Sequence, residues 1–173
     1  MPSVVLTGPE CTGKTTLAET LAAAYAAPWS PEYAREYAEA RGGALGATDV
    51  EPIARGQIAV EDAARAAAGG GLVVHDTDLV STVVYARHYY GGCPPWIVDA
   101  ARARLAALYL LCAPDVDWAD DTVRDSATTR DVLFAEFRAT LESLGASVVE
   151  IGGGWGEREA AARRAVEALL QER

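Results

Sequence analysis

The chain has little positive charge and almost no lysine. Its 173 residues include 15 Lys and Arg against 25 Asp and Glu, which gives a formal net charge of −10 at pH 7. Affinity for a nucleic-acid backbone comes from clustered Lys and Arg, so this charge balance argues against nucleic-acid binding. Fourteen of the fifteen cations are arginines, and Lys14 is the only lysine. A single lysine in a chain that otherwise uses arginine marks this position for closer inspection.

Cysteines and long apolar runs are also scarce. Cys11, Cys93 and Cys112 show no C-x-x-C spacing, so the sequence indicates neither a zinc site nor a disulfide framework. No apolar run reaches the length that spans a bilayer, and the N-terminus has neither the basic region nor the cleavage site of a signal peptide. We therefore expect a cytoplasmic protein without membrane insertion. The sequence leaves its oligomeric state open.

The remaining composition is that of one globular domain. Half of the residues are apolar and 23% are charged, which is too rich in core-forming residues for a disordered chain. A domain of this length buries roughly 70% of the surface of its unfolded chain. We expect residues 1–173 to form a single domain.

Short apolar runs alternate with longer helical patterns along the chain. The apolar runs predict strands over Ser3–Thr7, Trp29–Ser30, Leu72–His75, Leu108–Cys112 and Ser147–Ile151. Helical patterns cover Lys14–Ala27, Glu32–Ala40, Thr48–Gly69, Ser81–Tyr90, Trp96–Ala106, Asp131–Leu144 and Gly156–Leu170. Thr48 and Glu51 have the spacing of a capping box at the start of the third helix. The alternation predicts an α/β fold, a five-stranded parallel sheet with helices on both faces.

The strongest motif is GPECTGKT, at residues 8–15. It fits the phosphate-binding loop (P-loop, or Walker A) pattern G-x-x-x-x-G-K-[ST] without a gap, between a predicted buried strand and a helix. Glycines let the backbone close around a phosphate, and the helix N-terminus directs N–H groups and a positive dipole end toward it. The lysine adds charge at the outer phosphates, and the hydroxyl after it can bind Mg²⁺. We expect ATP with Mg²⁺ to bind here, with Lys14 catalytic and Thr15 a metal ligand. The predicted ATP-binding residues are Gly8, Pro9, Glu10, Cys11, Thr12, Gly13, Lys14, Thr15 and Thr16.

Two aspartates follow the third predicted strand. Asp76 comes directly after it, and Asp78 follows two residues later. In P-loop proteins a carboxylate at the end of a neighbouring strand holds the metal ion, and strand carboxyl ends face the ligand crevice. We assign Asp76 to this catalytic, metal-linked role and Asp78 to the acceptor of the phosphoryl group. The alternative is that Asp76 or Thr77 merely caps the following helix.

Two further segments hold candidates for binding the acceptor. Glu32, Tyr33 and Arg35 follow the short second strand, and Glu32 is a candidate to take the proton of a hydroxyl group. A solvated helix face explains the same charges. Tyr89, Tyr90 and Trp96 surround a Gly/Pro-rich break and could stack on a heteroaromatic ring, although core packing is the commoner role of such residues.

With these motifs assembled, the chain resembles the bacterial nicotinamide riboside kinases, in particular the kinase domain of the bifunctional NAD-salvage protein. The resemblance rests on GPECTGKTT, PEYAREYAE, VVHDTDLVSTVVYA and LYLLCAPDVDWADDTVRD, in this order over nearly the whole chain. It implies a P-loop kinase fold and transfer of the γ-phosphoryl group of ATP to the 5′-hydroxyl of nicotinamide riboside, giving nicotinamide mononucleotide. The bifunctional members carry an adenylyltransferase domain before the kinase. Because the P-loop here begins at Gly8, we expect this chain to make the mononucleotide without converting it to the dinucleotide.

Two alternative functions remain open. One is a P-loop ATPase or nucleotide switch that acts with a protein partner and transfers phosphate only to water. The other is a kinase for another nucleoside-like acceptor. A kinase needs a lid that excludes water from its donor, and we expect the charged segment at about 114–131 to form one.

Two arginines in the expected lid and one tryptophan complete the predicted site. Arg124 and Arg130 are predicted to offset negative charge on the transferring phosphoryl group. The alternative is surface pairing with nearby aspartates, worth under ~1 kcal/mol per pair. Trp155 follows three glycines after the last predicted strand, and the resemblance places this loop near the adenine. A packed tryptophan in a plain turn explains the same residues.

Overall fold

The fold is described from a computed structural model for residues 1–115 and 127–172. Within these residues the strands are β1 (Ser3–Thr7), β2 (Trp29–Ser30), β3 (Val73–Asp76), β4 (Leu108–Cys112) and β5 (Val148–Ile151). They form one parallel sheet in the order β2-β3-β1-β4-β5. The predicted five-stranded parallel sheet is confirmed.

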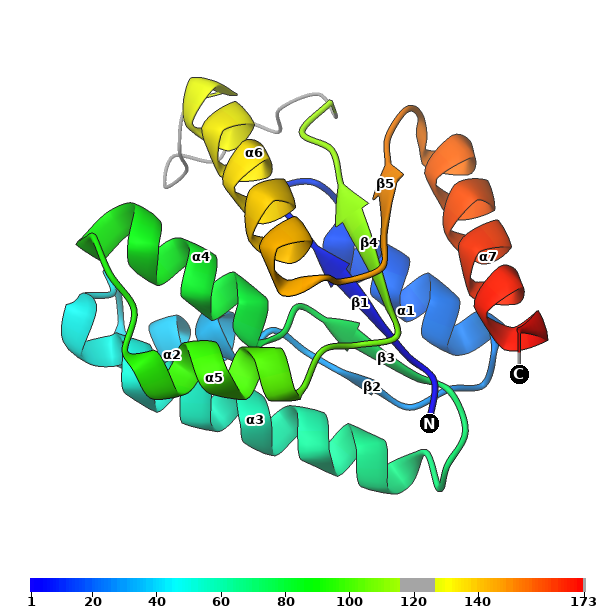
Figure 1. The fold of residues 1–173 in the computed structure, drawn as a ribbon, viewed down its shortest axis with the longest axis horizontal. Coiled ribbons are helices and arrows are strands. Elements are labelled where there is room, and N and C mark those ends of the chain that lie inside the picture. The colour runs from blue at the N-terminus through cyan, green and yellow to red at the C-terminus, as the bar shows by residue number, and fades with distance from the viewer. Residues whose placement is uncertain (116–126, 173) are drawn as a thin grey trace.

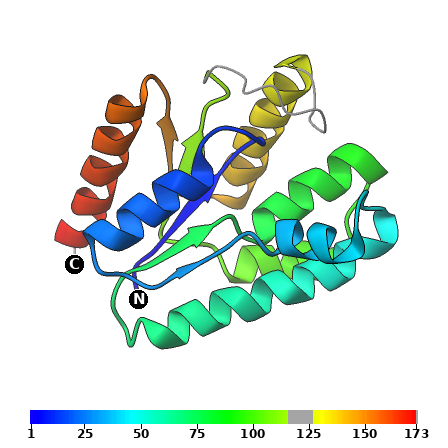
Figure 2. The ribbon, with the colours of Figure 1, turned by 180° about the vertical axis from the view of Figure 1, so that it is seen from behind.

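Helices cover both faces of the sheet. They are α1 (Lys14–Ala24), α2 (Tyr33–Arg41), α3 (Val50–Ala67), α4 (Leu79–Tyr90), α5 (Pro95–Ala103), α6 (Ala127–Leu144) and α7 (Trp155–Gln171), with a short 3₁₀ turn, η1 (Ala47–Asp49). Figure 1 shows α4, α5 and α6 in front of the sheet, and Figure 2, from behind, shows α1 and α7 on the opposite face. Among the described residues, no helix combines the length and the apolar character needed to cross a membrane.

The strands direct alternate side chains into two hydrophobic cores. Val5 of β1 packs with Tyr109 and Leu111 of β4 in the core under α3, α4, α5 and α6. Val4 and Leu6 pack in the other core, under α1 and α7. Every residue of β1 and β4 is buried, as expected for the central strands of a parallel sheet. The loops at the carboxyl ends of these strands therefore start from a rigid base.

The carboxyl ends of β1, β3 and β4 lie next to one another. Leu6 pairs with Asp76 on β3, and Thr7 pairs with Leu111 on β4. In open parallel sheets ligands bind outside the carboxyl ends of the strands, at the point where the strand order reverses. The phosphate-loop sequence, Asp76 and the end of β4 lie together at this edge.

The predicted capping box at the start of α3 is wrong. Thr48 lies within η1, and no side-chain hydrogen bond caps the helix. The carboxylate of Asp49 instead accepts hydrogen bonds from the amide of Gly46 at 2.8 Å and from the Arg41 guanidinium at 2.6 Å. These bonds hold the segment between α2 and α3, and they lower the pKa of Asp49 below its usual value, with the Gly46 bond the largest cause.

Two other helices, α4 and α6, begin at least two residues earlier than predicted. α4 begins at Leu79 because the carboxylate of Asp78 caps it by accepting a hydrogen bond from the amide of Val80 at 2.9 Å. α6 begins at Ala127, so the last residues of the expected lid, 127–131, are helical. Residues 116–126 of that lid lie outside the described residues.

Candidate functional site

The loop between β1 and α1 has the backbone of a phosphate-binding loop. Gly8 has a φ of +126°, and a Cβ there would lie 2.7 Å from the carbonyl oxygen of Cys112, so both conformation and space require glycine. Gly13 has a φ of +80° at the N-cap of α1, which begins at Lys14. The first amide groups of a helix have no partner within the helix and are available to an anion.

The Lys14 ammonium lies across this loop. Its Nζ donates a hydrogen bond to the carbonyl oxygen of Pro9 at 2.7 Å, and the hydroxyl of Thr12 donates to the same oxygen at 2.9 Å. The lysine is only 8% exposed. A cation held against a helix N-terminus concentrates positive potential at one point, as binding of the outer phosphates of a nucleotide requires.

Thr15 and Asp76 meet beside the lysine. Thr15 Oγ1 donates a hydrogen bond to Asp76 Oδ2 at 2.6 Å. The other oxygen, Asp76 Oδ1, is buried and has no hydrogen-bond partner among the described residues. Burial raises the pKa of Asp76 above its usual value, although the bond from Thr15 opposes this effect. A hydroxyl beside a buried carboxylate oxygen without a partner fits a hydrated Mg²⁺.

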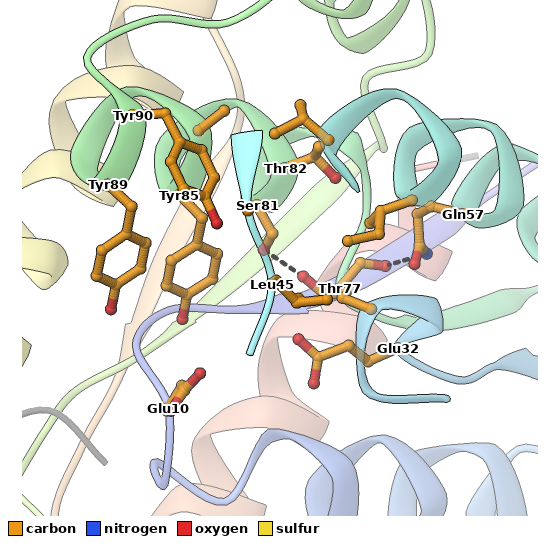
Figure 3. Close-up of a pocket in the computed structure, with 15 residues that line it drawn as sticks. Glu10, Glu32, Leu45, Gln57, Thr77, Ser81, Thr82, Tyr85, Tyr89 and Tyr90 are labelled. Atoms are coloured by element: carbon orange, nitrogen blue, oxygen red, sulfur yellow. Dashed lines mark hydrogen bonds between the residues drawn. The ribbon is translucent and has the colours of Figure 1, made fainter. Parts of the chain in front are cut away.

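A cavity of about 580 Å³ lies next to the phosphate loop. Figure 3 shows Tyr85, Tyr89 and Tyr90 of α4 on one side, Glu32 pointing in from the opposite side, and Glu10 reaching up from the phosphate loop. The other described residues of the lining are apolar or neutral: Ala34, Leu45, Gly46, Val50, Ile53, Gln57, Thr77, Ser81, Thr82 and Ala86. Aromatic walls with a few polar groups suit a nucleoside-sized molecule.

One wall of the cavity has an unusual backbone conformation. Thr77, directly after Asp76, has a φ of +70°, which is rare for a β-branched residue. Its hydroxyl is hydrogen-bonded to that of Ser81, and its carbonyl oxygen accepts a bond from the buried Gln57 side chain at 3.3 Å. The Gln57 carbonyl oxygen accepts the amide of Tyr33 at 3.0 Å. Gln57 therefore ties the start of α2 to the end of β3.

The structure brings some of the predicted acceptor residues to the cavity and leaves others outside. Glu32 and Tyr89 line it. Arg35 does not, and its exposed guanidinium lies 3.4 Å from the Glu32 carboxylate. Trp96 also lies outside the lining, and the guanidinium of Arg55 packs over its ring at 4.7 Å from the centroid.

Asp78 faces the core instead of the cavity. One carboxylate oxygen accepts the amide of Val80 at 2.9 Å, and the other accepts the hydroxyl of Tyr109 at 2.6 Å. The residue is 6% exposed, and burial raises its pKa to about 6. This geometry gives Asp78 contacts that hold α4 against β4, and its contact with the acceptor stays a prediction.

Tyr33 likewise packs against a helix. A Cβ added at Gly56 would lie 2.0 Å from the Tyr33 ring. The ring therefore rests on the backbone of α3 and sets the spacing between α2 and α3. Since Glu32 is the residue before Tyr33, this contact also places the Glu32 carboxylate at the cavity.

Gly56→Ala is expected to destabilise the protein and to raise KM for the acceptor. The new methyl group must displace the Tyr33 ring, and overpacking of this kind costs about 1–3 kcal/mol, against ~1 kcal/mol that alanine gains over glycine in a helix. Thermal unfolding and acceptor kinetics measure both effects. Gly156→Ala in α7 is the matched control, because a Cβ there meets nothing within 4 Å. Unchanged stability and KM in Gly56→Ala would contradict the packing role.

Three more residues are predicted to contact ATP or its transferred phosphoryl group, and two of them lie in the described part of the chain. Trp155 begins α7 and is 43% exposed, and a Cβ added at Gly13 would lie 3.2 Å from its ring. An indole therefore lies beside the phosphate loop, and its contact with adenine stays a prediction. Arg130 is 7% exposed near the start of α6, and its catalytic role also stays a prediction. Arg124 lies outside the described residues.

The predictions from the sequence omit three residues that this geometry makes prominent. Tyr85 lines the cavity, Gln57 ties two of its walls, and Arg158 bonds to the phosphate loop. Tyr85 lies one helical turn before Tyr89 and its ring is stacked on it, so the i,i+4 aromatic pair was an available signal. Nothing in the local sequence distinguishes Gln57 or Arg158 from exposed helix residues.

Residues 3–158 match the family model described as an AAA domain. The chain belongs to this family. The match covers the phosphate loop, the cavity lining and the start of α7. No curated protein matches the chain.

Solved structures with the same fold include two of the NadR protein. NadR in complex with NR is 29% identical with a TM-score of 0.80, over 97% of this chain and 51% of that chain. NadR in complex with NAD and AMP-PNP is 26% identical with a TM-score of 0.72, over 93% and 48%. This chain therefore spans about half the length of those two proteins.

A third structure supports the fold alone. YorR from Bacillus subtilis, in complex with phosphorylated GDP, is 19% identical with a TM-score of 0.60, over 98% of this chain and 97% of that chain. Together with the parallel sheet and the P-loop, these likenesses show that the AAA-domain chain has the fold of a P-loop kinase.

Proposed function

We propose that this domain is an ATP-dependent kinase that phosphorylates the 5′-hydroxyl of nicotinamide riboside and so produces nicotinamide mononucleotide. The likeness to NadR in complex with NR supports this acceptor, as do the motifs that resemble nicotinamide riboside kinases. The proposal depends most on one feature of the structure, which is the charge of the cavity lining.

Nicotinamide riboside differs from the common nucleosides because its pyridinium ring is permanently positive. Among the 15 described residues that line the cavity, Glu10 and Glu32 are carboxylates and none is Lys or Arg. Aromatic faces such as those of the three tyrosines attract cations as well. An acceptor that already carries a phosphate would meet two carboxylates and no cation among the described residues of the lining. The cavity therefore favours a cationic nucleoside over a nucleotide.

The transfer that we propose is a direct displacement. The acceptor hydroxyl oxygen forms a bond to the γ-phosphorus, the bond from that phosphorus to the β–γ bridging oxygen breaks, and ADP leaves. Glu32 is the proposed base for the hydroxyl proton. The candidate carboxylates are Glu32 and Asp78, and Glu32 is the one that lines the cavity. Lys14 and the N-terminus of α1 offset charge on the transferring oxygens.

Thr15 and Asp76 are the residues that would hold Mg²⁺. Thr15 would bind through its hydroxyl, and Asp76 would bind through water with its buried oxygens. When bound, the ion neutralises negative charge on the nucleotide phosphates. Thr15 and Asp76 themselves orient each other through their hydrogen bond and so preserve the geometry of the site.

An ADP-release assay that compares nicotinamide riboside with its uncharged reduced form tests this proposal. We expect a clear preference for the cation in kcat/KM. Glu10→Gln is expected to reduce that preference about three- to tenfold, because a carboxylate near the cation contributes roughly 1 kcal/mol once solvent screening is allowed for. Glu36→Gln is the control, since Glu36 is an exposed carboxylate of α2 outside the cavity lining.

The same assay separates the competing functions. Equal ADP release without any acceptor would support the ATPase or nucleotide-switch alternative. Higher kcat/KM for an uncharged nucleoside would leave the kinase in place and overturn the acceptor. A cation preference that Glu10→Gln leaves unchanged would contradict the charge argument.

A further inference from the structure

Arg158 is buried beneath the phosphate loop, although it does not line the cavity. It lies near the start of α7 and is 1% exposed. Its Nε donates to the carbonyl oxygen of Gly153 at 2.8 Å, and its Nη1 to that of Thr12 at 3.1 Å. Its Nη2 donates to the carbonyl oxygen of Ala113 at 3.0 Å and forms an ion pair with Asp115. One guanidinium therefore joins the phosphate loop, the end of β4 and the loop between β5 and α7.

The bond to Thr12 fixes the orientation of a peptide group in the phosphate loop. In a trans peptide the C=O of one residue and the N–H of the next point in opposite directions. The described residues contain no cis peptide bond. Because Arg158 holds the Thr12 carbonyl toward α7, the N–H of Gly13 points in the opposite direction, away from Arg158. An anion site in a backbone loop needs carbonyls directed out and N–H groups directed in.

A guanidinium is suited to this contact. Its planar fork presents donors in fixed directions, so one side chain can hold carbonyl groups from three separate segments. A buried charge is costly unless it is paired and hydrogen-bonded, and Asp115 supplies the pair. The second oxygen of Asp115 accepts the amide of Gly153 at 2.7 Å, which closes the network around the β5–α7 loop.

We propose that Arg158 is a positioning residue for the donor phosphates. It holds the phosphate loop in its anion-binding conformation and connects that loop to the glycine-rich segment that precedes Trp155. The proposal rests on the phosphate-binding part of the proposed function and does not involve the acceptor. Its test therefore contains no acceptor, so the two proposals fail separately.

Binding of inorganic tripolyphosphate with Mg²⁺, measured by calorimetry, tests the role of Arg158 without a nucleotide base. Arg158→Met is expected to weaken binding about tenfold or more, the effect of losing an oriented donor to a charged ligand. Arg158→Lys keeps the charge but not the fork, and we expect a smaller loss. Arg163→Gln is the control, because this arginine of the same helix pairs with Glu159 at the surface. The control should bind tripolyphosphate like the parent.

Stability distinguishes positioning from a purely structural role. A structural role lowers the unfolding temperature of the variants and leaves the affinity of the folded protein for tripolyphosphate unchanged, and that result would overturn the proposal. If Arg158→Met does not fold, the tripolyphosphate affinity of Asp115→Asn tests the proposal instead, because this substitution removes the ion pair and leaves the arginine in place. We then expect a loss of about threefold in affinity, near the lower range for one weakened polar contact. Parent-like affinity in Asp115→Asn would then count against the proposal.

The amide resonance of Gly13 gives a direct readout of the peptide orientation. In the parent it should move downfield when tripolyphosphate binds, because the N–H donates to the anion. In Arg158→Lys we expect a smaller movement at saturating ligand. An identical movement in both proteins would overturn the proposed orientation.

Discussion

Replacing Lys14 with alanine is expected to lower kcat on the order of 10³-fold, the scale of loss when a preorganised positive group is removed from a phosphoryl-transfer site. Stability should change little. The ammonium bonds to the Pro9 carbonyl, which keeps the Thr12 hydroxyl as a second donor after the substitution. Losing one such hydrogen bond costs about 1 kcal/mol. Turnover at saturating ATP and acceptor, with thermal unfolding in parallel, measures both effects.

Lys14→Arg is expected to be nearly as inactive as Lys14→Ala. Arginine keeps the charge, but its planar fork is larger than an ammonium, and Lys14 is only 8% exposed within a tight loop. Glu19→Gln, on the exposed side of the same helix α1, is the control and should retain parent turnover. If Lys14→Ala kept most of its activity, the phosphate-loop assignment would be wrong.

The parts of the fold that the sequence predicts well are those encoded in contiguous residues. β1 and β4 consist mainly of apolar residues, and both strands occur at the predicted residues because burial on both faces favours apolar side chains along the strand. The start of α3 is different. Thr48 and Glu51 satisfy a local capping pattern, but Asp49 gains bonds to Gly46 and Arg41, and Arg41 belongs to another helix. A local pattern cannot reveal this tertiary competition.

The candidate site also has one part that the sequence predicts and another that depends on tertiary packing. The phosphate loop is one unbroken segment, so its glycines and Lys14 are evident in the sequence. The cavity instead combines helix faces from α3 and α4 with the start of α2. Gln57 becomes important only because packing places it between Tyr33 and Thr77. Arg158 becomes important only because α7 docks beside the phosphate loop, 146 residues away from Thr12 in sequence.

Asp76 and Asp78 show how backbone conformation separates residues that the sequence treats alike. Both follow the same apolar run and both are carboxylates. The positive φ of Thr77 turns the chain between them. Asp76 then faces Thr15 of α1, whereas Asp78 faces Tyr109 of β4. The turn requires a conformation that a β-branched residue rarely adopts, and propensity alone does not predict it.

Asp76→Asn is expected to lower kcat about 10- to 100-fold at a fixed Mg²⁺ concentration, the usual effect of changing a group that orients a bound metal ion. Asparagine can still accept the hydrogen bond from Thr15, so the local structure should persist. It lacks the charge that favours a hydrated cation, and the Mg²⁺ concentration for half-maximal rate should rise. Asp78→Asn is the matched control, since Asp78 faces Tyr109. Equal changes in Mg²⁺ dependence in both variants would contradict the assignment.

The same substitution tests the buried charge through the pH dependence of stability. Burial raises the pKa of Asp76 in the folded protein, so the folded state binds the proton more tightly than the unfolded chain does. The stability that the protonated carboxyl contributes is therefore present at low pH and is lost as the pH rises through the folded pKa. Asparagine does not ionise, so Asp76→Asn does not lose this stability as the pH rises. Without nucleotide at neutral pH, the variant should unfold at a higher temperature than the parent, with the difference shrinking below about pH 4. A lower unfolding temperature of Asp76→Asn than of the parent at neutral pH would mean that the ionised Asp76 carboxylate stabilises the fold. The protein would then lose no stability by keeping this carboxylate at the site.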